Sequence, residues 1–327
     1  MRTRRLGAGG PSAGAVGLGC MGMSEFYDPV PEDEAVRTIH RALELGMTLI
    51  DTSDMYGRGE NERLVGRGLR GRRERAVLAT KVGIVRSEDP AYRGVDGRPE
   101  YVRAACDASL SRLGVERIDV YYLHRADPSV PIEETIGALA ELVAAGKVAH
   151  LGVSELSAET LRRAARAAPI AALQSEYSLF TRDVETNGVL AAARELGIAL
   201  VAYAPLGRGM LTGAVRSTEN LAAGDLRRRV PRFDAGNLER NLALVDELTA
   251  IAREHGATAA HIALAWLLSR GDDIIALPGS ERVAHAEENA SAADLVLDAE
   301  TTARIGALFA PSAVAGSRLR DTRFVNR

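Results

Sequence analysis

The sequence has few of the features that mark secreted proteins. It holds two cysteines among 327 residues, Cys20 and Cys106, which are far apart and form no CxxC motif. So few cysteines argue against a disulfide scaffold and indicate a reduced cytosolic protein. The basic start MRTRRLGAGG is not followed by an apolar run of signal-peptide length. We therefore expect no export signal and a cytoplasmic location.

Long apolar runs and a strong net charge are also missing. No stretch approaches the ~18 apolar residues that a membrane helix needs. The net charge is −3, which gives no general attraction to nucleic acid or to anionic membranes. We expect neither as a partner. The chain also shows no GxGxxG segment between a strand and a helix, and the glycines of GLGCMG, residues 17–22, do not qualify.

Apolar residues are plentiful and follow a regular pattern along the chain. They make up 46% of the sequence, enough for a large core. Short runs rich in Val, Ile and Leu alternate with longer segments of helical spacing. Such continuously apolar runs are typical of strands buried on both faces of a parallel sheet. We predict eight strands, over residues 15–21, 47–52, 76–82, 118–124, 148–154, 171–177, 199–205 and 273–279.

Helical signals lie between these runs. Residues 31–46 begin with Pro31 and three acidic residues and end at Gly46, which is typical of a helix start and stop. The segments 99–114, 132–146 and 257–271 also end at a glycine. Eight strands alternating with helices predict an α/β fold, a (β/α)₈ TIM barrel, as a single domain over 1–327. A doubly wound open sheet is the alternative, although it would more often use five or six strands.

A long connection follows the seventh predicted strand, over residues 207–236. Loops of this length in a compact domain are usually functional or disordered. A solvated surface is the alternative interpretation of its positive charge. Its arginines are Arg208, Arg216, Arg227, Arg228, Arg229 and Arg232.

Ionisable side chains gather at the ends of three consecutive predicted strands. Asp51 ends the second strand, and Tyr56 lies in the loop just after it. Lys81 lies at the end of the third strand and His124 at the end of the fourth. Because catalytic groups of a barrel come from the carboxyl ends of its strands, we expect these four to meet at one mouth. A purely structural ion pair between Asp51 and Lys81 is the alternative.

These residue types suit proton donation to a carbonyl oxygen. A phenol has a pKa near 10, and a nearby lysine cation lowers it. We predict that Tyr56 is the general acid, that Asp51 orients Lys81, and that His124 hydrogen-bonds the carbonyl. No side chain supplies a hydride, so a nicotinamide cofactor is its natural source. A Schiff-base lyase with Lys81 as nucleophile is the alternative.

Motifs along nearly the whole chain resemble the aldo-keto reductase superfamily. DTSDMYGRGENE, LATKVG, YYLHRADP, GVSE, LQSEYSLF and AYAPLGRGML follow its pattern in order, as do GLGCMGMSEFY and LPGSERVAHAEENA. The chain is most similar to the bacterial branch with a long loop after strand seven. The resemblance implies a barrel without a metal that reduces small aldehydes or ketones with NADPH, NADH being possible. Its Asp–Tyr–Lys–His tetrad falls on Asp51, Tyr56, Lys81 and His124. A cofactor-binding, redox-sensing subunit with little turnover is a further alternative.

The resemblance also implies which residues hold the cofactor, with the 207–236 loop clasping it. At the nicotinamide end these are Gly19, Met21, Ser154, Gln174 and Tyr203. At the pyrophosphate they are Leu206, Gly207, Arg208 and Gly209. At the adenosine and its 2′-phosphate they are Gly279, Ser280, Arg282, Glu288 and Asn289, beside a helix expected to start near residue 281.

One position departs from the pattern of the superfamily. Many relatives carry a lysine where this chain has Glu281, and a carboxylate there would repel a 2′-phosphate. His285 stands where some branches place an arginine. Dependence on a nicotinamide cofactor is therefore the firmer expectation, and preference for NADPH over NADH is the weaker one.

The substrate is expected to contact the loops that follow the strands. We expect these loops to form an apolar, aromatic mouth from Met23, Phe26, Tyr27, Met55, Tyr92, Arg125 and Phe233.

Overall fold

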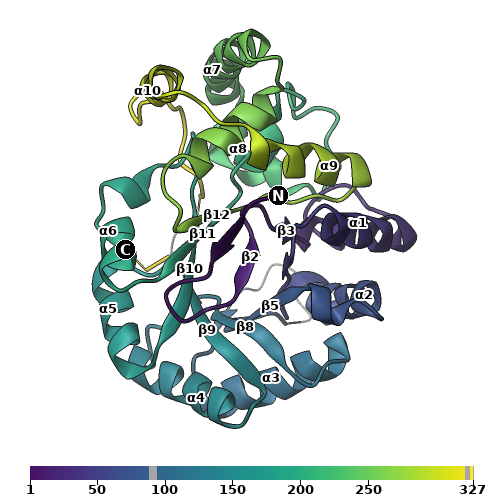
Figure 1. Cartoon of the computed structure of the whole chain (residues 1–327), viewed down its shortest axis with the longest axis vertical. Helices are drawn as coiled ribbons and strands as arrows, with labels where there is room; N and C mark the ends of the chain where they lie inside the picture. Colours follow the sequence, from purple (N-terminus) through teal and green to yellow (C-terminus); the bar gives the residue numbers. More distant parts are fainter. Residues whose placement is uncertain (88–93, 321–324, 327) are drawn as a thin grey trace.

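Eight parallel strands form a barrel in the computed structural model, which describes residues 1–87, 94–320 and 325–326 (Figure 1). The strands follow one another around the barrel in chain order. Parallel bridges from Val16 to Ala276 and from Gly19 to Gly279 join the first strand to the last. The predicted TIM barrel is confirmed, and the open sheet is wrong. The barrel strands are β3 (Leu18–Gly19), β4 (Leu49–Asp51), β5 (Val77–Val82), β8 (Ile118–Leu123), β9 (Val148–Ser154), β10 (Ile170–Glu176), β11 (Ala199–Tyr203) and β12 (Ile274–Leu277).

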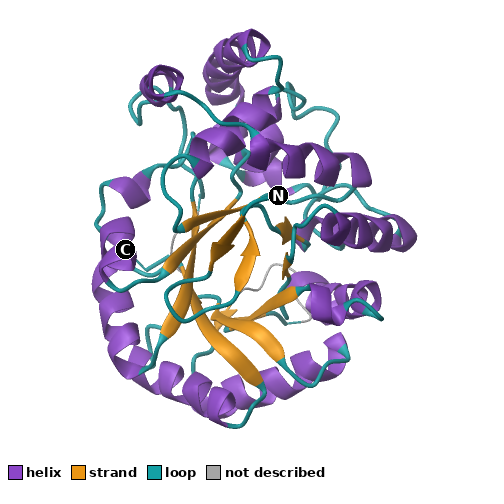
Figure 2. Ribbon diagram, viewed as in Figure 1, coloured by secondary structure: helices purple, strands orange, loops and turns teal. Residues whose placement is uncertain are grey.

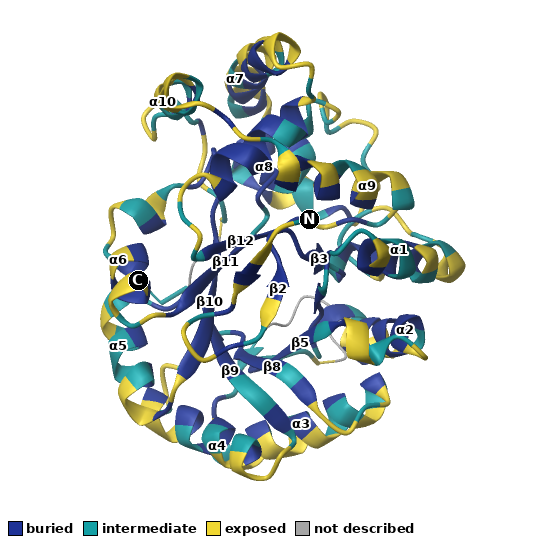
Figure 3. Cartoon of the chain, in the orientation of Figure 1, coloured by how far each residue is buried: buried dark blue, intermediate teal, exposed yellow. Residues whose placement is uncertain are grey.

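Helices surround the barrel (Figure 2), and most of them have buried residues on one side and exposed residues on the other (Figure 3). None of those in the described part of the chain has the length and hydropathy needed to cross a membrane. They are α1 (Glu32–Glu44), α2 (Glu60–Leu69), α3 (Pro99–Leu113), α4 (Ile132–Ala144), α5 (Ala158–Ala167), α6 (Val189–Glu195), α7 (Ala235–Glu254), α8 (Ala259–Leu268), α9 (Val283–Ser291) and α10 (Ala299–Leu308). Helix α8 is an exception to the two-sided burial, since none of its residues is exposed.

A small hairpin that the sequence pattern did not predict closes the amino end of the barrel. Its strands are β1 (Thr3–Arg5) and β2 (Ser12–Gly14). Leu6 and Ala13 pack into the apolar interior of the barrel, and both are almost fully buried. Because the hairpin covers this end, the carboxyl end of the strands remains as the face on which a site can form.

One glycine makes room for a large ring inside the barrel. Tyr122 on β8 is fully buried in the interior and pairs in register with Gly152 on β9. A Cβ atom added at Gly152 would lie 2.3 Å from the tyrosine ring. The tyrosine therefore fits below the barrel mouth only because its neighbour has no side chain.

The chain near GLGCMG does not form the turn of a Rossmann fold. Strand β3 is followed by the 3-10 helix η1 (Met21–Met23), and α1 begins only at Glu32. The predicted strand 15–21 is thus shortened to β3. Beyond β5, a short hairpin joins β6 (Ile84–Val85) to β7 (Gly94–Val95), which was not predicted either.

The 207–236 loop is mostly irregular, as predicted, with short 3-10 helices. These are η5 (Gly207–Thr212), η6 (Leu226–Arg229) and η7 (Pro231–Phe233). The backbone N–H of Leu226 donates to the carbonyl of Phe26 at 2.8 Å, so the loop reaches the segment that follows β3. The solvated-surface interpretation is wrong for three of its arginines, since Arg208, Arg227 and Arg232 have side chains only 10–13% exposed.

Candidate active site

The four residues singled out at the predicted strand ends lie together at the carboxyl end of the barrel. Asp51 is the last residue of β4, Lys81 lies near the end of β5, and His124 follows β8 directly. Tyr56 begins the 3-10 helix η2 (Tyr56–Gly59). The three strands are neighbours in the sheet, which is why residues far apart in sequence meet here. Each of the four is at most 8% exposed.

The ammonium group of Lys81 is at the centre of the cluster. It forms an ion pair with Asp51, donates to the carbonyl of Thr52 at 2.7 Å, and donates to the Tyr56 hydroxyl at 3.4 Å. These contacts match the three donors of an ammonium group. Burial by itself lowers the pKa of Lys81, but the charge of Asp51 and the contact with Tyr56 outweigh it, so the pKa is raised. Lys81 is therefore charged, and it is both a structural ion-pair partner and a neighbour of the phenol.

The other carboxylate oxygen of Asp51 is held by Gln174. The side-chain amide of Gln174, on β10, donates to it at 2.9 Å. Both carboxylate oxygens are thus engaged by buried donors on other strands. This arrangement fixes the direction in which Asp51 faces Lys81.

The phenol of Tyr56 is enclosed by other rings. Phe26 and His124 pack edge-on against it, with ring centroids 6.3 and 6.0 Å away. Burial raises the pKa of Tyr56, and the nearby Lys81 charge only partly opposes this. The predicted net lowering of the pKa is wrong for this structure, because the desolvation penalty of the phenolate exceeds its attraction to the Lys81 charge. Tyr56 consequently keeps its proton at neutral pH.

His124 is a neutral imidazole. Burial lowers its pKa well below the usual value, and the cations Arg125 and Lys81 add to that effect. Its Nδ1 atom lies 3.2 Å from the hydroxyl of Ser53. Arg125 donates to the backbone carbonyl of His124 at 2.6 Å and to the Ser154 hydroxyl at 3.0 Å.

The residues expected at the nicotinamide end surround this cluster. Ser154, Gln174 and Tyr203 come from the carboxyl ends of β9, β10 and β11, and the first two are almost fully buried. Gly19 pairs with Gly279 where the barrel closes, and Met21 follows in η1. The structure therefore brings this set to the same mouth as Tyr56.

The residues expected at the pyrophosphate form a tight turn after β11 that begins at Leu206. Gly207, Arg208 and Gly209 all have positive φ, at 57°, 58° and 89°. Left-handed backbone of this kind favours glycine and lets the chain approach a ligand closely. The Arg208 guanidinium lies 3.6 Å from the carboxylate of Glu176.

Of the residues expected at the adenosine, Gly279, Ser280 and Arg282 precede α9, and Glu288 and Asn289 lie in its second half. Buried Asn289 donates to the buried Ser280 hydroxyl at 2.9 Å. Helix α9 begins at Val283 rather than near 281, and the exposed Arg282 takes the N-cap position. Glu288 accepts from the hydroxyl of Thr258, the N-cap of α8, at 2.7 Å. Contact of these residues with adenosine stays a prediction.

Glu281 lies between β12 and α9. A Cβ atom added at Gly22 would fall 2.1 Å from its carboxylate oxygen, so the side chain covers the segment after β3. Its other oxygen lies 3.6 Å from Nδ1 of His285. This contact raises the pKa of His285. Repulsion of a 2′-phosphate by Glu281 stays a prediction.

Of the expected substrate-contacting residues, Phe26 and Arg125 lie near Tyr56. Met23, Met55 and Phe233 are buried, and Phe26 touches the Tyr56 ring. The guanidinium of Arg227 lies over the ring of Tyr27, 5.1 Å from its centroid. Tyr92 lies outside the described residues.

Ser53, Glu155 and Glu176 are among the polar residues at the mouth that were not predicted. Ser53 contacts His124, and Glu155 and Glu176 face arginines of the loop and of the C-terminal segment. Their positions in the sequence could have indicated them. Glu155 follows β9, Glu176 is the last residue of β10, and Ser53 lies in the DTSDMYG stretch. A single polar residue next to a strand end does not indicate a function by itself, because its partners are not visible in the sequence.

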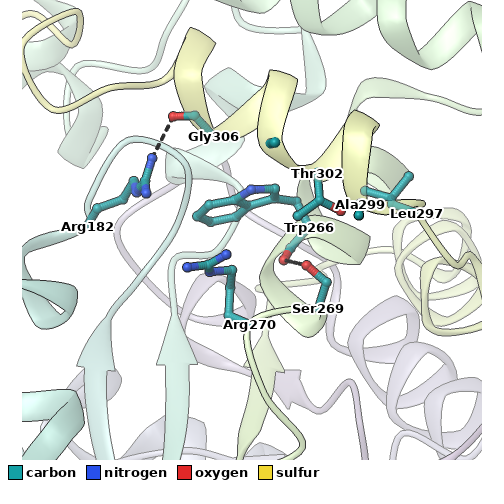
Figure 4. A pocket seen from close by; sticks show the side chains of 9 residues that line it. Arg182, Trp266, Ser269, Arg270, Leu297, Ala299, Thr302 and Gly306 are labelled. Atoms are coloured by element: carbon teal, nitrogen blue, oxygen red, sulfur yellow. Dashed lines mark hydrogen bonds between the residues drawn. The ribbon is translucent and has the colours of Figure 1, made fainter.

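A cavity of about 630 Å³ lies away from this mouth, between α8 and α10. Figure 4 shows the guanidinium groups of Arg182 and Arg270 beside the indole of Trp266, at 5.2 and 5.4 Å from the ring. Arg182 also donates to the carbonyl of Gly306 at 2.7 Å. None of the four clustered residues lines this cavity. A smaller cavity of about 220 Å³ is lined by Glu155, Glu176 and Arg318, among others.

Comparison with known proteins gives one consistent family. The model of the aldo/keto reductase family matches residues 15–309. An NADP(+) aldo-keto reductase of Schizosaccharomyces pombe is 42% identical over 97% of this chain and 94% of its own length. A probable aldo-keto reductase of Glycine max is 42% identical over 96% of this chain and 90% of its own.

Solved structures agree with the sequence relatives. A glycerol dehydrogenase from Gluconobacter oxydans has a TM-score of 0.86 at 32% identity, covering 94% of this chain and 96% of its own. An aldo/keto reductase from Klebsiella pneumoniae, in complex with NADP and acetate, has a TM-score of 0.75 at 28% identity, covering 98% and 99%. The chain therefore belongs to the aldo/keto reductase family and is an oxidoreductase.

Proposed function

We propose that this enzyme reduces aldehydes or ketones to alcohols with NADPH and that Tyr56 supplies the proton. The observation that carries the proposal is the Lys81 ammonium, which contacts both the Asp51 carboxylate and the Tyr56 hydroxyl at the barrel mouth. The name of the yeast relative and the ligand of the Klebsiella structure support NADP(H) as the cofactor.

Each of the four clustered side chains has its own role in the reduction of the carbonyl group. A bound nicotinamide supplies the hydride to the carbonyl carbon. Tyr56, protonated at neutral pH, donates its proton to the oxygen as negative charge develops there. Lys81 stabilises the phenolate that remains, and Asp51 keeps Lys81 charged and oriented. His124 hydrogen-bonds the same oxygen and fixes its position.

The residues present fit a dinucleotide across the mouth. The backbone carries no side chain at residues 19, 207, 209 and 279, and buried Ser154 and Gln174 offer polar atoms at the same mouth as Tyr56. We propose that Leu206–Gly209 hold the pyrophosphate and that Gly279, Ser280, Arg282, Glu288 and Asn289 hold the adenosine. Gly19, Met21 and Tyr203 complete the nicotinamide end.

The test is oxidation of NADPH and of NADH, followed by the nicotinamide absorbance. The carbonyl panel contains an aromatic aldehyde, a short aliphatic aldehyde and a dicarbonyl. Turnover that disappears in Tyr56→Phe while NADPH binding persists supports the proposal. Near-normal rates in Tyr56→Phe would refute the proton-donor role, and tight binding without turnover would favour the redox-sensing subunit.

The Schiff-base alternative is disfavoured by the state of Lys81. A lysine nucleophile must be uncharged, whereas the contacts with Asp51 and Tyr56 raise the pKa of Lys81. We expect no borohydride trapping of a carbonyl compound on the wild-type protein. Trapping that is lost in Lys81→Met would reverse this conclusion.

A further inference from the structure

The hydroxyl of Ser53 stands between two groups that compete for its single proton. It lies 3.2 Å from a carboxylate oxygen of Asp54 and 3.2 Å from Nδ1 of His124. It also accepts from the backbone N–H of Met55 at 3.3 Å. Ser53 is fully buried, so water does not replace either partner. A hydroxyl has one proton to donate, and only one of the two groups can receive it.

The protonation state of Asp54 decides which group receives that proton. An ionised carboxylate only accepts, so Ser53 must donate to Asp54. Nδ1 of His124 must then donate to Ser53, and Nε2 is left without a proton. A protonated Asp54 can instead donate to Ser53, which donates to Nδ1, and the single imidazole proton stands on Nε2. His124 is neutral in both cases.

We propose that Asp54 is a positioning residue that acts through Ser53 to set the tautomer of His124, and so decides whether His124 donates a hydrogen bond to the substrate carbonyl. The proposal rests on the proposed reduction of a carbonyl group. When Asp54 loses its proton to solvent, the Ser53 hydroxyl turns toward it and the imidazole proton moves from Nε2 to Nδ1. The net change is one proton released, with no charge change on His124.

The surroundings of Asp54 place this switch near physiological pH. Burial raises the pKa of Asp54 to about 8, with a further contribution from the negative charge of Glu62 on α2. The Ser53 hydrogen bond and Arg112 on α3 oppose the rise, but Arg112 is engaged by Glu62 at 2.6 Å. Tyr101 on α3 and Tyr121 on β8 also face this carboxyl group, and both are neutral phenols with raised pKa.

The first test reads the tautomer directly and needs neither cofactor nor turnover. The ring nitrogens of ¹⁵N-labelled His124, assigned with His124→Gln, are followed by NMR from about pH 6 to about pH 10. In the wild type we expect the proton on Nε2 at low pH and on Nδ1 at high pH, with a midpoint near 8. In Asp54→Asn the amide can donate to Ser53 at every pH, so the proton should stay on Nε2.

Asp96→Asn is the matched control. It removes a carboxylate that also faces Tyr101 but bonds Arg98 rather than Ser53, so the tautomer change should persist. A His124 tautomer that is constant in the wild type would refute the inference. The same change in Asp54→Asn as in the wild type would refute it as well.

The second test is the pH profile of carbonyl reduction. Losing one preorganised donor at a developing oxyanion costs about 100-fold in rate. We expect kcat/KM of the wild type to fall by that factor above the Asp54 pKa, and the fall to be absent in Asp54→Asn and retained in Asp96→Asn. A wild-type profile that Asp54→Asn leaves unchanged counts against the switch while leaving the reductase intact. The NMR result stands independently if no reductase activity is found.

Discussion

Tyr56 shows how two effects of opposite sign act on a single residue. Burial raises the pKa of its phenol, and the Lys81 charge partly reverses the rise. A phenol with such a pKa is protonated at neutral pH. The charge of Lys81 therefore has its largest effect on the phenolate that is left after proton donation. In the proposed reaction, the role of Lys81 is thus to stabilise the phenolate that forms, rather than to release the proton beforehand.

The substitution Lys81→Met should lower kcat by about 100-fold or more, as expected when a general acid loses its activating partner. Tyr56→Phe should have a similar effect, with NADPH affinity by fluorescence titration nearly unchanged in both. Tyr177→Phe removes a hydroxyl that bonds Glu185 away from the cluster, and it should retain turnover. Turnover of Lys81→Met close to the wild-type rate would mean that the ion pair is structural only.

Cofactor choice should depend on two neighbouring charges of opposite sign. Glu281→Gln should raise the preference for NADPH over NADH, because it removes the negative charge expected to repel the 2′-phosphate. Arg282→Ala should lower that preference. The measurement is the ratio of kcat/KM for the two cofactors in each variant. Equal changes for NADPH and NADH would show that neither side chain senses the phosphate.

The four clustered residues could be predicted from sequence, because three stand at the ends of apolar runs and Tyr56 follows one of them in the next loop. Their partners could not be predicted in the same way. Ser53 and Gln174 act through hydrogen bonds at 3.2 and 2.9 Å to groups 71 and 123 residues away. No local pattern encodes such a distance, and the pKa of Tyr56 was misjudged because burial of the ring is not visible in the sequence.

Among the elements, the C-terminal segment is attached to the barrel by a buried ion pair. Arg318 donates to one Glu155 oxygen at 2.8 Å and to the other as well. Asn326 bonds the backbone of Glu155 and of Ser157. Burial opposes ionisation of Glu155, but Arg318 outweighs it and lowers the pKa of Glu155 to about 2.

Arg318→Ala should destabilise the protein by about 3–5 kcal/mol, because it leaves the buried Glu155 carboxylate without its main partner. The depressed pKa means that this stabilisation is complete above the unfolded pKa, near 4.5, and is lost as the pH falls through about 2. Urea unfolding at neutral and at acid pH measures the difference. Arg320→Ala, which breaks an exposed pair with Asp234, should cost less than about 1 kcal/mol. Similar costs for both variants would contradict the anchoring role of Arg318.

Element boundaries show where sequence patterns are informative. The barrel strands were predicted because both of their faces are buried, which leaves a continuous apolar run. The hairpin of β1 and β2 was missed because its strands are three residues long and β1 carries two arginines. Arg4 is buried there because its guanidinium donates hydrogen bonds to the carbonyls of Leu268 and Gly271, both at 2.8 Å, and to that of Ile274.

For the whole molecule, packing inside the barrel limits what the site can tolerate. Gly152→Ala should lower stability by about 1–3 kcal/mol, because the new methyl group overlaps the Tyr122 ring and the interior must shift. Gly137→Ala on α4 is the matched control, since no atom lies within 4 Å of its added Cβ, and it should not destabilise the protein. Thermal unfolding of both variants decides the matter. Equal melting temperatures would show that the interior is more adaptable than its packing indicates.

Because the hairpin closes the amino end, the barrel is accessible from one end only. Anything that reacts at Tyr56 must enter and leave at the carboxyl end of the strands, because Leu6 and Ala13 fill the opposite end. A cofactor and a substrate that both bind there must use the same entrance. If the cofactor binds beside the buried Ser154 and Gln174 as proposed, we expect it to bind before the carbonyl compound and to leave after the alcohol.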